Sequence, residues 1–490
     1  MLGFLWHLGV FAFPPRNDQG HNHNNISKRQ EGMCKVDQIR KSQNWLKRIR
    51  SLILTLLTFA AMQVLTAQNM QTAPGAQIFN LTEPGFYSEP AVTIDPENPQ
   101  HIIVVFQNEA HAAYSRDEGK HWTVASGVQS KQYRVSGDVS AAFDTKGHAI
   151  ICYMAFDKLG TFNYWGHNSS RNGLYVRRSL DGGKTWEPQD HTIVAQTSSP
   201  DVPWEDKPYI VSDTTKGPYS GNLYVGWTRW SLTNSKILLT RSSDDGLTWS
   251  TPIEIDDHPG LPRDDNGALE GFDGAVDNHG KLYAVWAGDN HIQFAVSRNG
   301  GKSFSRPRNI IDTAPIMFQV ESVERSNGFP QIAVDSRGRK DRLYVTWSDY
   351  RNGDVDVFCS TSTDGGRTWT TANRVNNDPI HNGADQFFQW LALDPSSGAV
   401  NVMFYDRRTD PTNRSQTIVL ARSTDGGKSF VNYAWTQKPF DAFGDFLGDY
   451  TGLAAMNGRV YGAWTIRPSQ TLGNILQVGI ADFPESGSKH

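Results

Sequence analysis

Acidic and aromatic residues recur at one place in this 490-residue chain, just ahead of short apolar runs that end in Asp. Aligning these runs on their Asp brings together, in two neighbouring columns, Glu89, Asp138, Asp206, Lys207, Glu270, Asp449 and Tyr450. Carboxyl groups accept hydroxyl hydrogen bonds or exchange protons, and aromatic faces pack on the C–H groups of sugars. The mixture suits carbohydrate chemistry. The alternative is hydrogen bonding between neighbouring segments around a water-filled channel.

Cationic residues follow the second apolar run of several repeats. They are Arg229 and the segments Asp349-Tyr350-Arg351 and Asp406-Arg407-Arg408, of which the last two stand at equivalent positions. Arginines on adjacent segments can bind one carboxylate through paired N–H donors. The alternative is local, with Asp349 and Asp406 pairing with the arginines of their own loops. Lys207 beside Asp206 also has two interpretations, a structural ion pair or a ligand-binding group.

The elements that must position these groups belong to a repeat. An eight-residue pattern, Ser-x-Asp-x-Gly-x-Thr-Trp, recurs six times with small variations, and its third residue is Asp117, Asp181, Asp244, Asn299, Asp364 and Asp425. The spacings are 64, 63, 55, 65 and 61 residues. Asp and Ser can hydrogen-bond their own backbone, and Gly supplies a positive φ, so the pattern predicts a tight turn. Near-constant spacing predicts a repeat architecture.

Each repeat of about 60 residues contains short β-branched and aromatic runs separated by Gly, Asp and Asn, which indicates antiparallel strands. Four strands per repeat predict an all-β fold, a β-propeller of seven four-stranded blades, with six blades as the alternative. We expect the repeated turn between the third and fourth strands. The last unit, 443–483, lacks the turn and a fourth strand, which residues 76–81 could supply. The carboxylates and arginines would then share the face opposite the repeated turns.

The repeated turns resemble the Asp boxes of the sialidase-like, BNR-repeat superfamily over about residues 76–483. This resemblance implies a propeller and, in sialidases, three arginines that bind the substrate carboxylate, an Asp acid/base and a Tyr nucleophile paired with Glu. On that resemblance Arg351 and Arg408 match two arginines, Tyr450 matches the nucleophile, and Asp138 or Glu89 matches the acid. The first arginine is missing, because Ser88-Glu89-Pro90 stands in its place. A carboxylate there opposes an anionic sugar.

The resulting expectation is a sialidase-like glycoside hydrolase acting on extracellular glycans. The expected catalytic residues are Glu89, Asp138 and Tyr450, and the expected substrate-binding residues are Asp206, Lys207, Arg229, Glu270, Asp349, Arg351, Asp406, Arg407, Arg408 and Asp449. Two alternatives remain open. One is a non-catalytic propeller that binds carbohydrate or protein, and the other is a polysaccharide lyase, which needs a base and a group that neutralises a carboxylate.

The first 67 residues have a different character from the repeats. Lys47, Arg48 and Arg50 precede an apolar run over 52–61, which predicts a secretory signal peptide cleaved near Ala67. Because some 45 residues precede this segment, Met33 is a plausible true start. An uncleaved anchor is the alternative. We therefore expect an N-terminal extension and signal peptide over 1–67, a single propeller domain over 68–490, no stable membrane span after cleavage, and a secreted or periplasmic location.

Composition narrows the remaining function classes. Beyond residue 67 the chain carries 38 Lys and Arg against 48 Asp and Glu, which argues against a nucleic-acid partner. Three cysteines cannot build a disulfide scaffold, and no Cys/His cluster has zinc spacing. We expect a glycan as partner, no cofactor, and a monomer. The oxygen-rich segment Asp264-Asp265-Asn266 leaves Ca²⁺ open without predicting it.

Overall fold

The computed structural model describes residue 50 and residues 70–130, 133, 135–157, 171–197 and 203–484. The chain divides into two compact units, Met1–Thr66 and Ala67–His490. The expected signal peptide and the candidate start at Met33 lie outside the described residues. Among those residues, no helix is long and apolar enough to cross a membrane.

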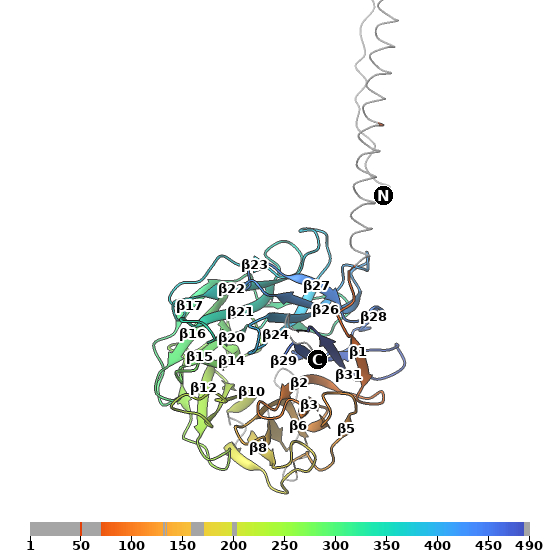
Figure 1. Ribbon diagram of the computed structural model, residues 1–490. Coiled ribbons are helices and arrows are strands. Elements are labelled where there is room, and N and C mark those ends of the chain that lie inside the picture. The colour runs from red at the N-terminus through yellow and green to blue at the C-terminus, as the bar shows by residue number, and fades with distance from the viewer. Residues whose placement is uncertain are drawn as a thin grey trace, which may run out of the picture. The chain divides into compact units, whose positions relative to one another are not determined.

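Seven four-stranded antiparallel sheets form a ring, so the propeller of seven blades is confirmed (Figure 1). Blade 1 consists of β2 (Ser88–Ile94), β3 (Ile102–Gln107), β4 (His111–Ser115) and β5 (Thr123–Val124). Blade 2 consists of β6 (Val135–Phe143), β7 (Ala149–Phe156), β8 (Arg171–Ser179) and β9 (His191–Thr197). Blade 3 consists of β10 (Trp204–Ser212), β11 (Leu223–Trp230), β12 (Ser235–Ser242) and β13 (Ile253–Glu254). In each blade the first strand named lies nearest the axis.

The second half of the ring carries two additions to this plan. Blade 4 consists of β14 (Glu270–Val276), β15 (Leu282–Gly288), β16 (His291–Ser297) and β17 (Arg308–Asp312). Blade 5 consists of β20 (Gln331–Asp335), β21 (Arg342–Asp349), β22 (Asp356–Ser362) and β23 (Asn373–Arg374). Between them lies a small hairpin of β18 (Met317–Phe318) and β19 (Ser326–Asn327). Blade 6 consists of β24 (Gln386–Leu393), β25 (Val400–Asp406), β26 (Ser415–Ser423) and β27 (Val431–Ala434), and β28 (Phe440–Asp441) pairs with β26.

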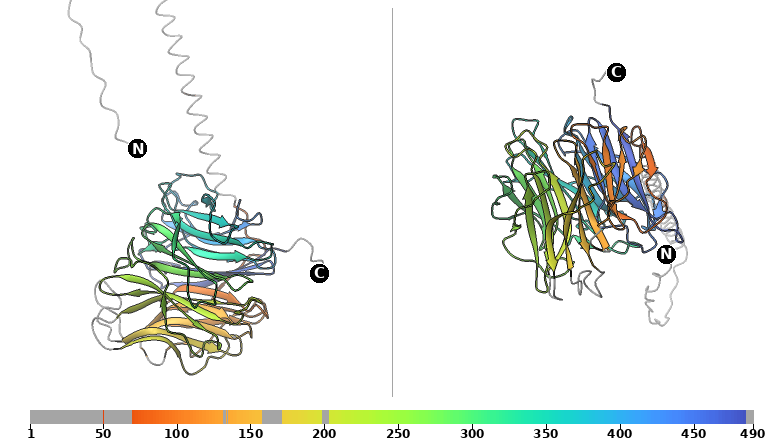
Figure 2. Two further views of the ribbon diagram at one scale, coloured as in Figure 1. Left: turned by 90° about the vertical axis from the view of Figure 1, so that its left-hand side faces the viewer. Right: turned by 90° about the horizontal axis from the view of Figure 1, so that it is seen from below.

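Blade 7 joins the two ends of the propeller chain. Its strands are β29 (Gly452–Met456), β30 (Arg459–Ile466), β31 (Ile475–Asp482) and, as the outermost, β1 (Gln77–Asn80). β1 pairs antiparallel with β31 from Gln77 opposite Ile480 to Asn80 opposite Gln477, as the sequence predicted. Figure 2 shows the orange first strands beside the blue last ones. Mixing both ends of the chain in one sheet closes the ring and leaves no open edge between the first and last blades.

The repeated turns lie where they were expected, directly after the third strand of a blade. In blade 5, Ser362 Oγ donates to Asp364 Oδ1 at 2.8 Å, and the N–H groups of Gly366 and Thr368 are satisfied by Ser362 Oγ and Asp364 Oδ1. Large apolar side chains of the second strands fill the space between blades, with Trp227, Trp286, Trp347 and Trp464 fully buried. The pattern is therefore structural, and it marks the face opposite the starts of the innermost strands.

Candidate functional site

The innermost strands of five blades open with a backbone irregularity. Glu89, Asp138, Lys207, Gly271 and Phe388 have φ between 46° and 72°, and the pairing of each innermost strand shifts register at that point. For a residue other than Gly this conformation costs about 1–2 kcal/mol. Such bulges re-aim side chains and are common beside functional sites. The aligned column found in the sequence is thus a ring of bulges at the axis.

A cleft of about 330 Å³ opens on this face. Its acidic lining includes Glu89, Asp138, Asp206 and Asp264, its aromatic lining is Phe86, Phe156, Trp204, Trp230 and Phe446, and the cations that line it are Lys207 and Arg325. Its walls therefore come from blades 1 to 3 and from the segments that precede blades 4, 5 and 7. A concave site with aromatic walls and a few converging polar groups is the usual form of a ligand site.

Glu89 lies at the base of the cleft and is 1 % exposed. Its Oε1 accepts a hydrogen bond from the backbone N–H of Asp449 at 3.0 Å, while its buried Oε2 has no hydrogen-bond partner among the described residues. Burial, and then the negative charge of Asp449, raise the pKa of Glu89 to about 7 against the opposing effect of Lys207 and Arg325. A carboxyl group that titrates near neutral pH can serve as a general acid.

Asp138 supplies a second buried carboxyl group from the adjacent blade. Burial, and then the charges of Glu89 and Asp206, hold its pKa well above the usual range. Its backbone N–H donates to Gln107 Oε1 at 2.9 Å, which ties the bulge of blade 2 to blade 1. Asp206 accepts a hydrogen bond from the indole of Trp230 at 2.8 Å. Because burial and neighbouring negative charge both disfavour the ionised form, the carboxyl group of Asp138 holds its proton more strongly than a solvent-exposed carboxyl group does.

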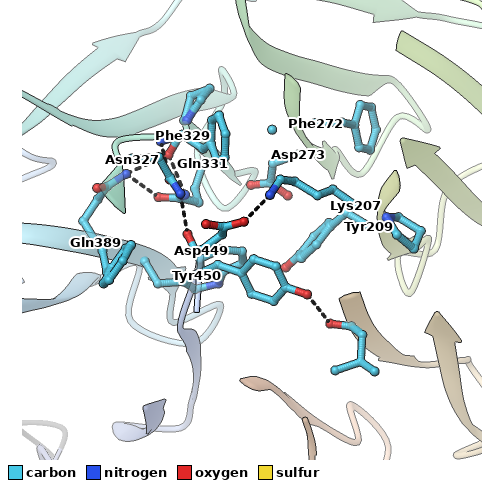
Figure 3. Close-up of a pocket in the computed structure, with 16 residues that line it drawn as sticks. Lys207, Tyr209, Phe272, Asp273, Asn327, Phe329, Gln331, Gln389, Asp449 and Tyr450 are labelled. Atoms are coloured by element: carbon cyan, nitrogen blue, oxygen red, sulfur yellow. Dashed lines mark hydrogen bonds and ion pairs between the residues drawn. The ribbon is translucent and has the colours of Figure 1, made fainter. Parts of the chain in front are cut away.

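An ion-pair network that includes cleft-lining residues crosses the axis. Lys207 pairs with Asp449 and lies 3.2 Å from Glu270 Oε1, while Arg325 Nε donates to Asp449 Oδ1 at 2.8 Å and its Nη1 lies 3.2 Å from Asp264 (Figure 3 shows Lys207 and Asp449). Burial acts against ionisation of Asp449, but the charges of Arg325 and Lys207 outweigh it and lower the pKa of Asp449. Both cations are therefore already engaged by protein carboxylates.

Tyr450 faces a separate axial cavity that meets the cleft at Lys207. Its hydroxyl donates to the backbone oxygen of Val139 at 3.4 Å, and its ring centroid lies 6.0 Å from that of Trp390. Figure 3 shows Tyr450 among the residues that line this cavity. Burial, followed by the charges of nearby carboxylates including Glu89, raises the pKa of Tyr450 well above its usual range. The phenol is neutral at ordinary pH, and Tyr450 is not among the residues that line the cleft.

The structure does not bring the predicted arginines into the cleft. Arg351 Nε donates to Asp349 Oδ1 at 2.8 Å, and Arg408 Nε donates to Asp406 Oδ2 at 2.6 Å, which is the local alternative. Fully buried Arg407 donates to Gln416 at 3.1 Å. Arg229, on blade 3, pairs with buried Glu205 at 2.7 Å. Arg351 and Arg408 thus pair with carboxylates at the ends of second strands, Arg229 pairs with a carboxylate of the innermost strand β10, and Arg407 binds an amide. No three-arginine cluster is found among the residues that line the cleft.

Sequence reasoning missed Arg325 and Phe446. Arg325 immediately precedes β19 in the insertion between blades 4 and 5, and its guanidinium lies 4.9 Å above the ring of Phe446, which precedes blade 7. Neither segment belongs to the four-strand repeat, so no alignment of repeats could place them. The only signal was the extra length between the two blades, which does not reveal where the insertion folds.

The acidic segment considered for Ca²⁺ is engaged by protein groups. Asp264 pairs with Arg325, Asp265 pairs with Arg263 at 3.1 Å, and Asn266 Oδ1 accepts from the Met317 N–H at 2.9 Å. Among the described residues, the cluster with metal-ligand spacing is Asp144, His148 and Asp245, in which Asp245 is also paired with Lys146. The first of these sets borders the cleft through Asp264, and the second lies at the other end of the innermost strand of blade 2.

No family model matches the chain. The chain is 26 % identical over 278 residues to a sialidase from Micromonospora viridifaciens. This alignment covers 52 % of this chain and 40 % of that protein. The chain thus matches less than half of that relative's length, and the similarity supports a place in the sialidase-like superfamily.

Solved structures give a more distant likeness. The intramolecular trans-sialidase from Ruminococcus gnavus is 12 % identical with a TM-score of 0.47, covering 70 % of this chain and 96 % of that one. An ulvan lyase is 10 % identical with a TM-score of 0.48, covering 82 % and 95 %. Likeness at this level does not define a reaction, which has to come from the site.

Proposed function

We propose that this protein is a glycoside hydrolase of sialidase-like architecture, in which Glu89 is the general acid and Asp138 is the second carboxyl group. The observation that carries the proposal is the pair of buried carboxyl groups on the bulges of adjacent blades, one with an unpartnered oxygen, at the base of an aromatic-lined cleft. Glycosidic cleavage requires one protonated and one ionised carboxyl group on either side of the bond. The raised pKa of Glu89 supports the protonated form of the acid. Because the negative charge of Glu89 is one cause of the raised pKa of Asp138, protonation of Glu89 favours ionisation of Asp138.

We further infer that the substrate presents a neutral sugar to this pair. A sialoside would place its carboxylate among Glu89, Asp138 and Asp206, with Lys207 and Arg325 as the cleft-lining cations. Both cations are held by Asp449, so binding an anion would require breaking buried ion pairs. The sialidase similarity supports a glycan as substrate, and the Lys47–Ala67 pattern supports export as the route by which the protein would meet it.

A panel of chromogenic glycosides tests this proposal. The panel should contain neutral α- and β-glycosides and a sialoside, and the full chain should be compared with Glu89→Gln, Asp138→Asn and Glu324→Gln. Glu324 is an exposed carboxylate that lines the same cleft, so its variant is the matched control. We expect cleavage of a neutral glycoside, a fall of about 10²- to 10⁴-fold in the first two variants, and little change in the third. Silence across the panel, or full activity in both Glu89→Gln and Asp138→Asn, contradicts the proposal.

A further inference from the structure

Phe86 is an exception among the large apolar side chains of the propeller. It is 82 % exposed, whereas the other exposed large apolar side chains of the described residues range from 39 % to 56 %. It nevertheless lines the rim of the cleft. An exposed aromatic ring at the mouth of a cleft with aromatic walls can extend the ligand-binding surface beyond the cleft.

The backbone that carries Phe86 is held firmly. The N–H of Gly85 donates to the Asn474 oxygen at 2.9 Å, and the N–H of Asn474 donates back to the Gly85 oxygen at 2.6 Å. On the other side, Tyr87 packs edge-on against Phe106 with ring centroids 5.6 Å apart. Because the residues on either side of Phe86 are anchored, the fold itself holds this ring in its exposed position.

The surroundings of Phe86 favour a sugar over an apolar partner. Trp204 and Phe156, in contact at 4.9 Å between centroids, line the cleft with Trp230 and Phe446. Asn108 and Glu109 line it as well and, with the carboxylates at its base, offer acceptors for hydroxyl groups. Flat rings beside hydrogen-bond acceptors match the alternating C–H faces and hydroxyl edges of a pyranose. An apolar protein segment would leave these carboxylates desolvated and unpaired.

The positions of Glu89, Asp138 and Phe86 indicate that the ligand has more than one sugar unit. Glu89 and Asp138 are 1 % and 6 % exposed at the base of the cleft, while Phe86 remains almost fully open to solvent. A group that packs on Phe86 would therefore be the part of a ligand that emerges from the cleft. We propose that Phe86 is a stacking platform for the sugar next to the one held at Glu89 and Asp138, so that the ligand is an oligosaccharide or polysaccharide segment. This inference rests on the proposed glycan-binding role of the cleft.

Binding measurements on oligosaccharide ladders test the platform. We would use calorimetry with cello-, xylo-, manno- and galacto-oligosaccharides of one to four residues, in a full-length Glu89→Gln background to prevent turnover. The comparison adds Phe86→Ala, Phe86→Leu, Phe86→Trp and Tyr350→Ala. Tyr350 is the matched control, an aromatic 41 % exposed in the β21–β22 loop of the same face that does not line the cleft. Thermal unfolding of each variant shows that the fold is kept.

In the parent, we expect affinity to rise by about tenfold from one sugar residue to two or three, the scale of one well-packed aromatic contact. Phe86→Ala and Phe86→Leu should remove that gain, Phe86→Trp should keep it, and Tyr350→Ala should leave it unchanged. Three results would overturn the proposed role of Phe86: no oligosaccharide series binds, Phe86→Ala keeps the gain in affinity with length, or Phe86→Ala weakens binding equally at every length. Cleavage of aryl glycosides by the wild type decides the hydrolase proposal separately. A Phe86-dependent gain without cleavage would keep the platform and reject the hydrolase.

Discussion

The backbone N–H of Asp449 in blade 7 donates to the Glu89 carboxylate in blade 1 at 3.0 Å, although the two residues are 360 positions apart. The same Asp449 side chain binds Lys207 from blade 3 and Arg325 from the insertion before blade 5. The site is thus assembled at the seam where the ring closes. The contact between blades 7 and 1 that accompanies closure of the ring therefore also completes the candidate active site.

Gly448 should be essential at this seam. A Cβ there would lie 2.8 Å from Glu89 Cγ and 2.9 Å from its backbone nitrogen, at a φ of 111°. We expect Gly448→Ala to lower the free energy of unfolding by about 2–4 kcal/mol, through strain and a displaced Glu89, and to reduce glycoside cleavage. Gly444→Ala is the control, because its φ is 85° but nothing lies within 4 Å of the added Cβ. Urea unfolding that shows equal losses in the two variants would contradict this account.

The pH dependence of activity should report on Glu89. As the proposed general acid, Glu89 must be protonated, so kcat/KM should fall as pH rises through about 7. The charge of Arg325 lowers the pKa of Glu89, so Arg325→Gln should move the alkaline limb to higher pH, by roughly one unit or less. Arg414→Gln removes a cation paired with Glu321 outside the cleft and should leave the limb in place. A limb that moves to lower pH in Arg325→Gln would reject the assignment of Glu89.

Asp273 should make the propeller less stable as pH rises. It is buried beside the axial cavity, accepts N–H bonds from Gly274 and Ile332 at 2.8 Å, and burial raises its pKa to about 7. Between the unfolded pKa near 4 and the folded value, only the native state binds the proton, so each pH unit costs about 1.4 kcal/mol. Asp273→Asn should therefore show a shallower fall in unfolding free energy from pH 4 to 7. If the unfolding free energies of the wild type and Asp273→Asn fell in parallel with pH, this role of Asp273 would be wrong.

The repeated turns should affect stability without affecting the site. Asp425 accepts hydrogen bonds from Ser423 Oγ and from the Ser429 N–H and hydroxyl, and the bond from the Ser429 side chain lowers its pKa to about 2. Asp425→Ala should lower the melting temperature by about 2–4 °C at pH 7 and by less as pH falls towards 2. Because the turn lies on the opposite face, kcat/KM should stay within about twofold. A large loss of activity at unchanged stability would contradict this separation.

Some site residues were readable from sequence because a bulge recurs at a fixed distance from the Asp that ends each innermost strand. Glu89, Asp138 and Lys207 share that position and the same positive φ, so aligning the repeats places them at the axis. The contacts of the arginines could not be predicted in this way. The predicted position of Arg351 and Arg408 after the second strand was correct. Each guanidinium, however, pairs with the Asp two residues earlier in the chain and does not extend into the cleft.

The amino-acid sequence by itself determined the β-propeller architecture, with seven blades preferred over six, since turn chemistry and strand periodicity are local and repeat along the chain. It also determined that acidic groups would gather on one face. Only the tertiary structure decided which of them share a cleft, which cations reach it, and that Phe86 stands open at its rim. Those outcomes depend on where insertions such as the one bearing Arg325 fold back, and on how burial and neighbouring charges divide protons among Glu89, Asp138 and Asp449. Such through-space effects have no counterpart in the spacing of residues along a chain.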